Sequence, residues 1–280
     1  MHGRRDRCSS EIPESDRLSE NRSDQTRIAD SWLGIDRQLM KHMNSRVIRT
    51  VVFLSVQSKK GCRVEKSLER LGMDHVDLYY QHRIDPKVEP EVAAETMGEL
   101  IKEGKIRSWG ISETTEEYLR RANAVTPVTA IENRYSMMAR WHESIWPVCE
   151  ELDIAYVAFS PMANGFLTGA YNPQTKFEGS QDYRARMPQY TEEGYAKARE
   201  LLDLLNEMAA QKNCTMAQLS LAWMICKKPY IIPIPGSRKL ERLRANFEAG
   251  NVIVTPEEIA LIDAKLDTMQ FDVFGGHQAK

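Results

Sequence analysis

The segment Gly236-Ser237-Arg238-Lys239-Leu240-Glu241-Arg242 contains residue types that bind anions. It follows the apolar run 230–235, which is typical of a buried strand, and its glycine predicts a turn into a helix. The first turn of a helix offers unpaired backbone N–H groups, and Arg238 and Arg242 would share one helical face. Arginine also forms paired hydrogen bonds with phosphate. Two interpretations stay open: a phosphate site, with the 2′-phosphate of NADP as natural occupant, and an ordinary turn with a solvated basic face.

From about residue 61 predicted strands alternate with predicted helices, and these elements must position such a site. Strands are predicted at 76–81, 106–111, 128–131, 155–159 and 230–235. Helices are predicted at 64–71, 90–101, 143–152, 192–211, 215–226 and 238–248, with one after a capping box of Thr114 and Glu117 and one capped by Thr255 and Glu258. This alternation predicts parallel strands, whose ligands lie at the carboxyl ends. The residues at those ends are His82, Ser112, Glu113, Glu132, Asn133, Ser160 and Ser237.

The amino-terminal part differs from this pattern. Residues 1–30 are highly charged with little apolar periodicity, which predicts disorder, and 31–46 could form a short helix. The β-branched run 47–56 resembles a strand. We therefore expect an irregular segment at 1–46 and a folded domain at 47–280.

Composition narrows the class of protein. The 280 residues carry 38 basic and 40 acidic side chains, so the net charge of −2 gives no indication of a nucleic-acid partner or an anionic membrane. The five cysteines are scattered without a CxxC pair, which argues against a disulfide framework and a metal site. No apolar run is long enough to span a bilayer. We expect a cytoplasmic protein, with Arg120-Arg121 and Lys227-Lys228 on its solvated surface.

Several motifs together resemble the aldo-keto reductase family. They are Ser67-Leu68-Glu69-Arg70-Leu71-Gly72, Val76-Asp77-Leu78-Tyr79-Tyr80-Gln81-His82, Glu103-Gly104-Lys105-Ile106-Arg107-Ser108-Trp109-Gly110-Ile111-Ser112, Phe159-Ser160-Pro161 and the segment 233–246. The resemblance runs from about Val64 to Leu266 and is greatest to the branch with bacterial general reductases and potassium-channel β-subunits. It implies an α/β fold, a parallel (β/α)8 TIM-type barrel that is incomplete at its N-terminus. It also implies NADP(H) as cofactor and a small aldehyde or ketone as substrate.

Site residues follow from the same resemblance. His82 matches the histidine that orients the substrate carbonyl, and the alternative for it is a histidine that merely caps a strand. Ser112, Glu113 and Glu132 match the contacts to the nicotinamide carboxamide, although Glu132 stands where glutamine is usual and, as a carboxylate, could not donate to the amide oxygen. Phe159 matches an aromatic residue that stacks on the nicotinamide, or is a core residue. Ser160, Met162, Asn164 and Gly165 match the loop beside the pyrophosphate, and Gly236, Ser237, Arg238, Arg242 and Asn246 match the contacts to the adenosine 2′-phosphate and adenine.

The amino-terminal part departs from the family pattern. The aspartate, tyrosine and lysine of the catalytic tetrad have no matching positions, since Lys59 and Lys60 lie too far beyond Ser55. Without the tyrosine the proton donor is missing, and general acid catalysis contributes about 10²–10⁴-fold. The first hypothesis is an NADP(H)-dependent oxidoreductase with impaired turnover. The alternative is a non-catalytic protein that binds NADP(H) or a partner, and a weaker third possibility is another phosphate-binding barrel enzyme. The open barrel edges could be covered by self-association or by a partner.

Overall fold

The computed structural model describes residues 51–54, 62–177 and 182–273, and the predictions for 1–46 lie outside this part. Its strands are β1 (Val51–Leu54), β2 (Val76–Gln81), β3 (Ile106–Ser112), β4 (Ala130–Arg134), β5 (Ala155–Phe159) and β6 (Ile231–Pro233). Its α-helices are α3 (Cys62–Leu71), α4 (Pro90–Lys102), α5 (Glu116–Val125), α6 (Trp146–Leu152), α7 (Glu192–Gln211), α8 (Met216–Lys227), α9 (Leu240–Glu248) and α10 (Pro256–Asp267). Short 3₁₀ helices are η1 (Glu143–Ile145), η2 (Ala163–Thr168), η3 (Tyr183–Arg186), η4 (Pro188–Tyr190) and η5 (Ala249–Asn251).

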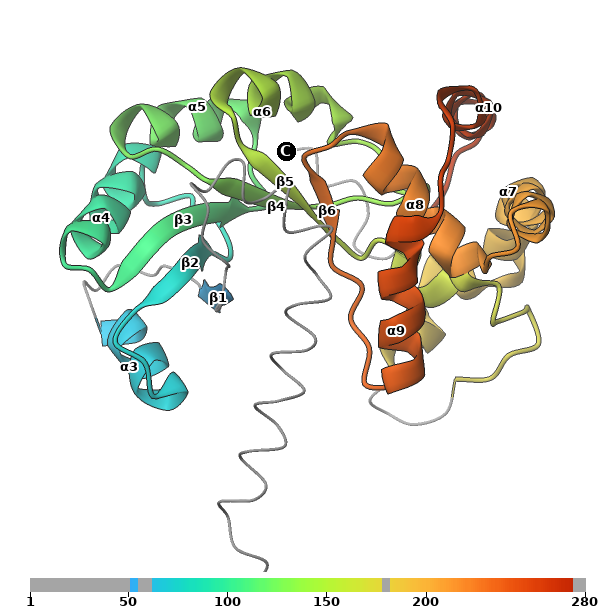
Figure 1. Ribbon diagram of the computed structural model, residues 1–280, viewed down its shortest axis with the longest axis horizontal. Helices are drawn as coiled ribbons and strands as arrows, with labels where there is room; N and C mark the ends of the chain where they lie inside the picture. The colour runs from blue at the N-terminus through green and yellow to red at the C-terminus, as the bar shows by residue number, and fades with distance from the viewer. Residues whose placement is uncertain (1–50, 55–61, 178–181, 274–280) are drawn as a thin grey trace, which may run out of the picture.

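The strands form one sheet in the order in which they occur along the chain, and every neighbouring pair is parallel. A helix follows each strand from β1 to β4, so the chain repeats the β/α unit of a barrel (Figure 1). Within the described residues β1 and β6 are each paired on one side alone. The predicted α/β barrel class is thus confirmed, and the predicted incompleteness toward the amino end concerns residues outside the described part.

The sheet has two different faces because successive strand residues point to opposite sides. Helices α4, α5 and α6 cover its convex side (Figure 1). There the strands contribute large buried side chains to the main core, among them Tyr79, Trp109, Ile131 and Tyr156. The concave side carries a smaller apolar cluster, made of Leu78, Tyr80, Ala130, Ala155, Val157 and Ile232. The concave face is the interior of the barrel, and its residues at the carboxyl ends of the strands can meet a ligand.

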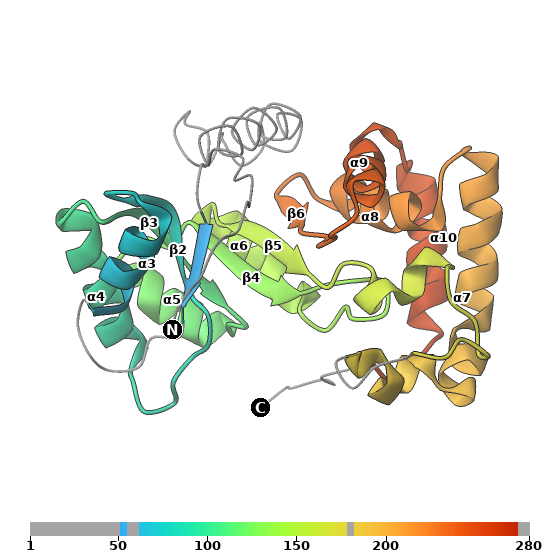
Figure 2. The same ribbon diagram turned by 90° about the horizontal axis from the view of Figure 1, so that it is seen from below.

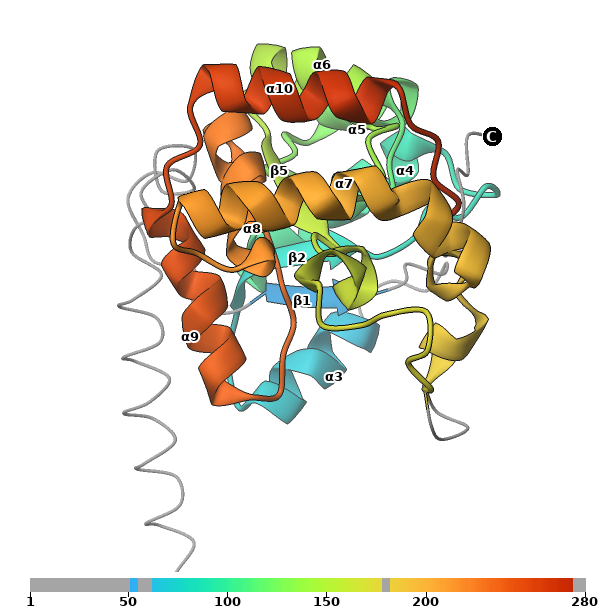
Figure 3. The ribbon, with the colours of Figure 1, turned by 90° about the vertical axis from the view of Figure 1, so that its right-hand side faces the viewer.

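Helices α7 to α10 gather beyond β6, away from α3 to α5 (Figures 2 and 3). Helix α8 contacts α7, α9, α10 and β6. An ion pair between Lys265 and Glu200 also joins α10 to α7. On α8, Leu219 and Trp223 are fully buried, so these apolar residues belong to the core.

Most predicted boundaries hold to within about two residues, and the starts of α5 and α9 differ for identifiable reasons. The capping box of Thr255 and Glu258 is present at α10. Helix α5 is capped by Thr115, whose side chain accepts from the Tyr118 N–H, and not by Thr114. Two adjacent threonines offered two candidate caps, and the Thr114 N–H is held instead by the Asn133 side chain at 3.1 Å. Helix α9 begins at Leu240, two residues later than predicted, because Lys239 is extended.

The free edge of β6 offers few backbone donors. The N–H of Ile234 donates to the Ala158 carbonyl at 3.0 Å, so even-numbered residues of this strand face β5. The odd-numbered residues face the free edge, where Pro233 and Pro235 have no N–H and that of Ile231 donates to Lys228. Proline on an edge strand opposes pairing with a further strand. Self-association that covers an open edge remains a prediction, and this edge of β6 is poorly suited to it.

Candidate functional site

Strand register brings three of the predicted site residues to the carboxyl end of the concave face. Ser112 pairs in register with Glu132, and Glu132 pairs with Val157, a member of the concave cluster. Tyr80 also belongs to that cluster, and alternation places His82, two residues later, on the same side. His82, Ser112 and Glu132 therefore come from three consecutive strands and share one end of the interior.

The loop after β3 is held against the end of β4 by several hydrogen bonds. Glu113 adopts a left-handed conformation with φ of 56°, its N–H donates to the Glu132 carbonyl, and its Oε1 accepts from the Arg134 N–H at 3.0 Å. The Asn133 side chain accepts from the Thr114 N–H and donates to the Thr114 carbonyl at 3.2 Å. Asn133 thus fixes the loop and contributes no free group to a ligand.

Glu132 is the most perturbed carboxyl group at this end of the sheet. Its side chain lies on the concave face, the residue is 7 % exposed, and Oε2 has no hydrogen-bond partner in the described part of the chain. Burial raises its pKa to about 7, the Arg83 guanidinium opposes this shift and the Glu113 carboxylate adds to it. An acid in this state can carry a proton at neutral pH.

His82 has an environment that favours its neutral form. Partial burial lowers its pKa, and the neighbouring Arg83 guanidinium lowers it further. The same guanidinium donates to the Ser112 hydroxyl at 3.1 Å and to the His82 carbonyl at 2.6 Å. At neutral pH an imidazole of this kind holds one N–H that can donate to a substrate oxygen.

Phe159 ends β5 on the same concave side, in register with Arg134. The Arg134 guanidinium lies 5.3 Å from the centroid of the Phe159 ring, a cation–π contact. Phe159 is half-buried. One face of its ring is therefore covered by Arg134.

The loop after β5 contains an unusual run of left-handed residues. Ser160, Ala163, Asn164 and Gly165 have φ values of 53°, 47°, 61° and 97°. Hydrogen bonds hold this shape: the Tyr190 hydroxyl donates to the Asn164 carbonyl at 3.1 Å. Non-glycine residues with positive φ are uncommon and concentrate at ligand-binding loops. Ser160, Met162, Asn164 and Gly165, predicted beside a pyrophosphate, form this loop.

The basic segment after β6 differs from the expected helix start. Arg238 precedes α9, whereas Arg242 lies in its first turn, so the two do not share a helical face as predicted. The cause is a local turn in which the Ser237 hydroxyl accepts from the Lys239 N–H at 3.2 Å. Arg238 and Arg242 are exposed, and within the described residues neither makes an ion pair. By contrast, Arg120, Arg121 and Arg140 each contact carboxylates.

A hollow of about 700 Å³ lies between the β4–α6 connection and the end of the described chain. Its apolar lining includes Met137, Met138, Trp141, Met269, Phe271 and Val273. The last residues of the described chain thus form one side of this hollow. Pro188 of η4 also lines the hollow. In Figure 2, η3 and η4 lie toward the carboxyl ends of β3, β4 and β5, which the arrowheads mark.

A metal site and a membrane-spanning helix were both looked for among the described residues. Among 51–54, 62–177 and 182–273 we find no cluster of His, Cys, Asp and Glu that could hold a metal ion. In the same part of the chain, every helix is too short or too polar to cross a bilayer.

Comparison with known proteins identifies this arrangement. The sequence model of the aldo/keto reductase family matches residues 57–267. The chain belongs to the aldo-keto reductase family. Aldo-keto reductase str7 of Strobilurus tenacellus is 38 % identical over 200 residues, which are 70 % of this chain and 59 % of that protein. The chain thus spans about three fifths of the length of this relative.

Solved structures agree with this aldo-keto reductase assignment. A glycerol dehydrogenase from Gluconobacter oxydans superposes with a TM-score of 0.69 at 25 % identity, over 74 % of this chain and 63 % of that one. An aldo/keto reductase from Klebsiella pneumoniae, in complex with NADP and acetate, superposes with a TM-score of 0.61 at 24 % identity. The second alignment covers 84 % of this chain and 76 % of that one.

Two arginines of this aldo-keto reductase site were not selected from the sequence. Arg83 contacts Ser112 and affects the pKa of His82 and of Glu132, and Arg134 covers Phe159. The sequence could have indicated both arginines. Arg83 directly follows His82, and Arg134 lies two residues after Glu132 and so points to the same side of the strand. Gly236 lies in the exposed segment before α9 and Asn246 lies within α9, and their role in cofactor binding stays a prediction.

Proposed function

We propose that this chain binds NADP(H) and acts as an oxidoreductase that reduces small aldehydes or ketones to alcohols by hydride transfer. The observation that carries the proposal is the group of His82, Ser112 and Glu132 at the carboxyl end of the concave face, with Oε2 of Glu132 lacking a partner within the described chain. Such a buried polar atom needs a ligand or a proton to complete it. Membership of the aldo-keto reductase family supports this choice of cofactor and reaction.

The residues present fit NADP(H) by their chemistry. The left-handed loop of Ser160, Met162, Asn164 and Gly165 would hold the pyrophosphate, as backbone N–H groups do elsewhere. Gly236, Ser237, Arg238, Arg242 and Asn246 would hold the adenosine and its 2′-phosphate, since the exposed guanidinium groups match a dianion. Ser112, Glu113 and Glu132 would face the carboxamide and Phe159 the nicotinamide ring. When bound, the cofactor supplies the hydride.

His82 would orient the substrate. Its neutral imidazole can donate one N–H to a carbonyl oxygen and so hold the carbon toward the hydride donor. Burial and the Arg83 guanidinium both lower the pKa of His82, and Arg83 also donates to the Ser112 hydroxyl. Because the aspartate, tyrosine and lysine of the family's tetrad have no matching positions, we expect proton delivery to the alkoxide to be slow.

A specific observation favours a second function, binding of NADP(H) without turnover. Strand β1 is Val51–Leu54 and carries no lysine or tyrosine, so the described part of this strand supplies no proton donor and no cation to lower a tyrosine pKa. Titration of NADPH by tryptophan quenching, combined with a turnover assay on a reactive ketone, separates the two functions. Binding with turnover supports the enzyme, binding alone supports the second function, and folded protein without binding contradicts both.

We expect His82→Ala to lower kcat about a hundredfold while the affinity for NADPH changes little. A misplaced substrate can cost about this factor, because hydride transfer needs close alignment. Steady-state kinetics on the ketone and an NADPH titration measure the two quantities. His75→Ala, on the loop before β2, is the matched control and should leave both unchanged. Equal kcat values in the two variants would contradict the role of His82.

We expect Arg242→Ala to weaken NADPH binding about tenfold and NADH binding hardly at all. A charge-assisted hydrogen bond contributes about 1.5 kcal/mol or more, and NADH lacks the 2′-phosphate that would receive it. Arg199→Ala on the exposed face of α7 is the control. Equal losses for NADPH and NADH would place the phosphate elsewhere.

A further inference from the structure

The carboxyl group of Glu132 is placed as a neutral acid would be. Its Oε2 atom has less than 1 Å² of accessible surface and no hydrogen-bond partner in the described part of the chain. An ionised oxygen in this position would give up the hydrogen bonds of water without replacement, which is costly. A protonated carboxyl avoids most of this cost and gains an O–H donor.

The groups around Glu132 come from both neighbouring strands, and together they do not stabilise its ionised form enough to offset burial. After β2, the Arg83 guanidinium favours the ionised form, but it already donates to Ser112 and to the His82 carbonyl. After β3, the Glu113 carboxylate favours the neutral form. Tyr80 of β2 lies near enough for Glu132 to raise the pKa of its phenol, and on β5 the register partner is the apolar Val157. Burial outweighs Arg83 and brings the pKa of Glu132 to about 7.

We propose that Glu132 binds the carboxamide of the nicotinamide as a neutral carboxylic acid, donating its O–H to the amide oxygen and accepting from the amide nitrogen, so that cofactor binding takes up a proton. This inference rests on the proposed binding of NADP(H). It answers the difficulty that a carboxylate at this position cannot donate, because the protonated side chain offers the same donor and acceptor pair as a glutamine.

The chemistry of NADP(H) favours its carboxamide over its other groups at Glu132. Phosphates are anionic and would be repelled by the Glu113 carboxylate beside this site. Arg238 and Arg242, which suit phosphate and make no ion pair with the described residues, belong to a different segment, after β6. The carboxamide is uncharged and pairs with a carboxylic acid through two hydrogen bonds. Adenine could pair in a similar way, and the experiment separates the two.

Proton uptake sets the direction of the pH dependence. Well below pH 7 Glu132 is already neutral, so binding needs no additional proton and the affinity is constant. Above pH 7 the free group is ionised and must gain a proton on binding, so affinity falls by up to about tenfold for each pH unit.

The test compares NADPH with 2′,5′-ADP, which has the adenine and the 2′-phosphate but no carboxamide. We expect wild-type affinity for NADPH, followed by fluorescence between about pH 6 and about pH 9, to fall more steeply than affinity for 2′,5′-ADP. Glu132→Gln should remove this excess and bind NADPH at least as tightly at the alkaline end. Calorimetry in two buffers of different ionisation enthalpy should show uptake of up to one proton in the wild type and less in the variant. Glu95→Gln, exposed on α4, is the matched control.

Two results overturn the inference while leaving NADP(H) binding intact. One is a pH dependence for NADPH that parallels the one for 2′,5′-ADP: a steep fall shared by both ligands would place adenine at Glu132, and a shared absence of it would show that Glu132 gains no proton on binding. The other is an unchanged pH dependence in Glu132→Gln. The comparison of ligands uses wild-type protein and so tests the inference even where the variant does not fold. Absence of NADPH binding at every pH would instead contradict the proposed function itself.

Discussion

Replacing Lys227 with alanine is expected to lower the free energy of unfolding by about 3 kcal/mol, because it removes the cation shared by two carboxylates that are only about a quarter exposed. The Lys227 ammonium lies 2.8 Å from a carboxylate oxygen of Glu143 and 2.8 Å from one of Asp263, and its side chain is 11 % exposed. It also lies over the rings of Trp146 and Trp223, at 5.3 and 4.6 Å from their centroids. One ammonium thus joins η1, α6, α8 and α10.

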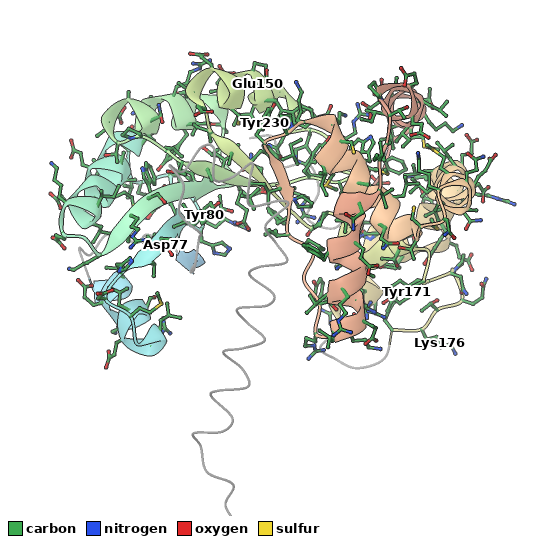
Figure 4. All side chains as sticks on the ribbon, viewed as in Figure 1. Asp77, Tyr80, Glu150, Tyr171, Lys176 and Tyr230 are labelled. Atoms are coloured by element: carbon green, nitrogen blue, oxygen red, sulfur yellow. The ribbon has the colours of Figure 1, made fainter. Side chains whose placement is uncertain are left out.

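The adjacent residue provides a matched control. Lys228 pairs with Glu150, which also accepts from the Tyr230 hydroxyl at 2.8 Å (Figure 4), and both charged side chains are more than a third exposed. Exposed pairs contribute about 0–1 kcal/mol, so Lys228→Ala should have a small effect. Urea unfolding followed by circular dichroism measures both variants. Similar losses in the two would show that the Lys227 network contributes no more than a surface pair.

The pH dependence of unfolding gives an independent check on Lys227. Burial by itself raises the pKa of Glu143, but hydrogen bonds from Lys227 and Tyr135 outweigh it and hold the pKa below the ordinary 4.5. A carboxyl group whose folded pKa is lowered contributes stability that is present above its unfolded pKa and lost as pH falls through the folded value. The difference between wild type and Lys227→Ala should therefore be largest near neutral pH and shrink under acid conditions below about pH 4.5. A difference that stays constant in acid would contradict the assignment.

Lys227 also shows where sequence reasoning failed. Lys227-Lys228 was expected on the solvated surface, which is correct for Lys228 and wrong for Lys227. Adjacent residues on a helix differ by about 100° in direction, so one can face the core while the next faces water. The partners Glu143 and Asp263 lie 84 and 36 residues away in sequence, and no local pattern indicates that they converge on α8.

The fold itself was predictable because local signals agreed with one another. The run from Val76 to Gln81 contains residues that favour strands, Val76, Tyr79 and Tyr80, and the structure forms β2 over those residues. The capping box at Thr255 is equally local. Starts that depend on tertiary contacts were less predictable: the β4 strand begins at Ala130 because it pairs with β3 there, whereas the apolar run begins at Val128.

The candidate site could be predicted in its positions but not in its electrostatics. The rule that ligands lie at the carboxyl ends of parallel strands selected His82, Ser112 and Glu132. It could not show that the Glu132 carboxyl is buried beside Glu113, since that follows from the left-handed turn of Glu113 and from the register of β3 with β4. The raised pKa is thus a property of the fold.

Adding a side chain at Gly110 is expected to destabilise the protein by about 3 kcal/mol for alanine and by more for valine, because the space is filled. A Cβ atom there would lie 2.4 Å from Cε1 of Tyr80 and 2.6 Å from the Ala130 carbonyl oxygen. Tyr80 lies on the concave side of the sheet (Figure 4) and cannot retreat freely, since it is 1 % exposed. Gly236→Ala is the control: an added Cβ meets nothing within 4 Å, so thermal unfolding should hardly change.

A double variant separates the two contacts at Gly110, because a substitution can remove the Tyr80 ring but not the Ala130 carbonyl. Tyr80→Ala removes the ring that the added Cβ would meet. The Ala130 carbonyl oxygen, the second contact, belongs to the paired strand β4 and stays in place. The combination of Tyr80→Ala and Gly110→Ala should therefore be less destabilising than the sum of the single changes, yet clearly less stable than Tyr80→Ala alone. Full additivity would show that the ring does not limit Gly110. A double variant as stable as Tyr80→Ala would show that the backbone of β4 yields, and with it the register that places Glu132 opposite Ser112.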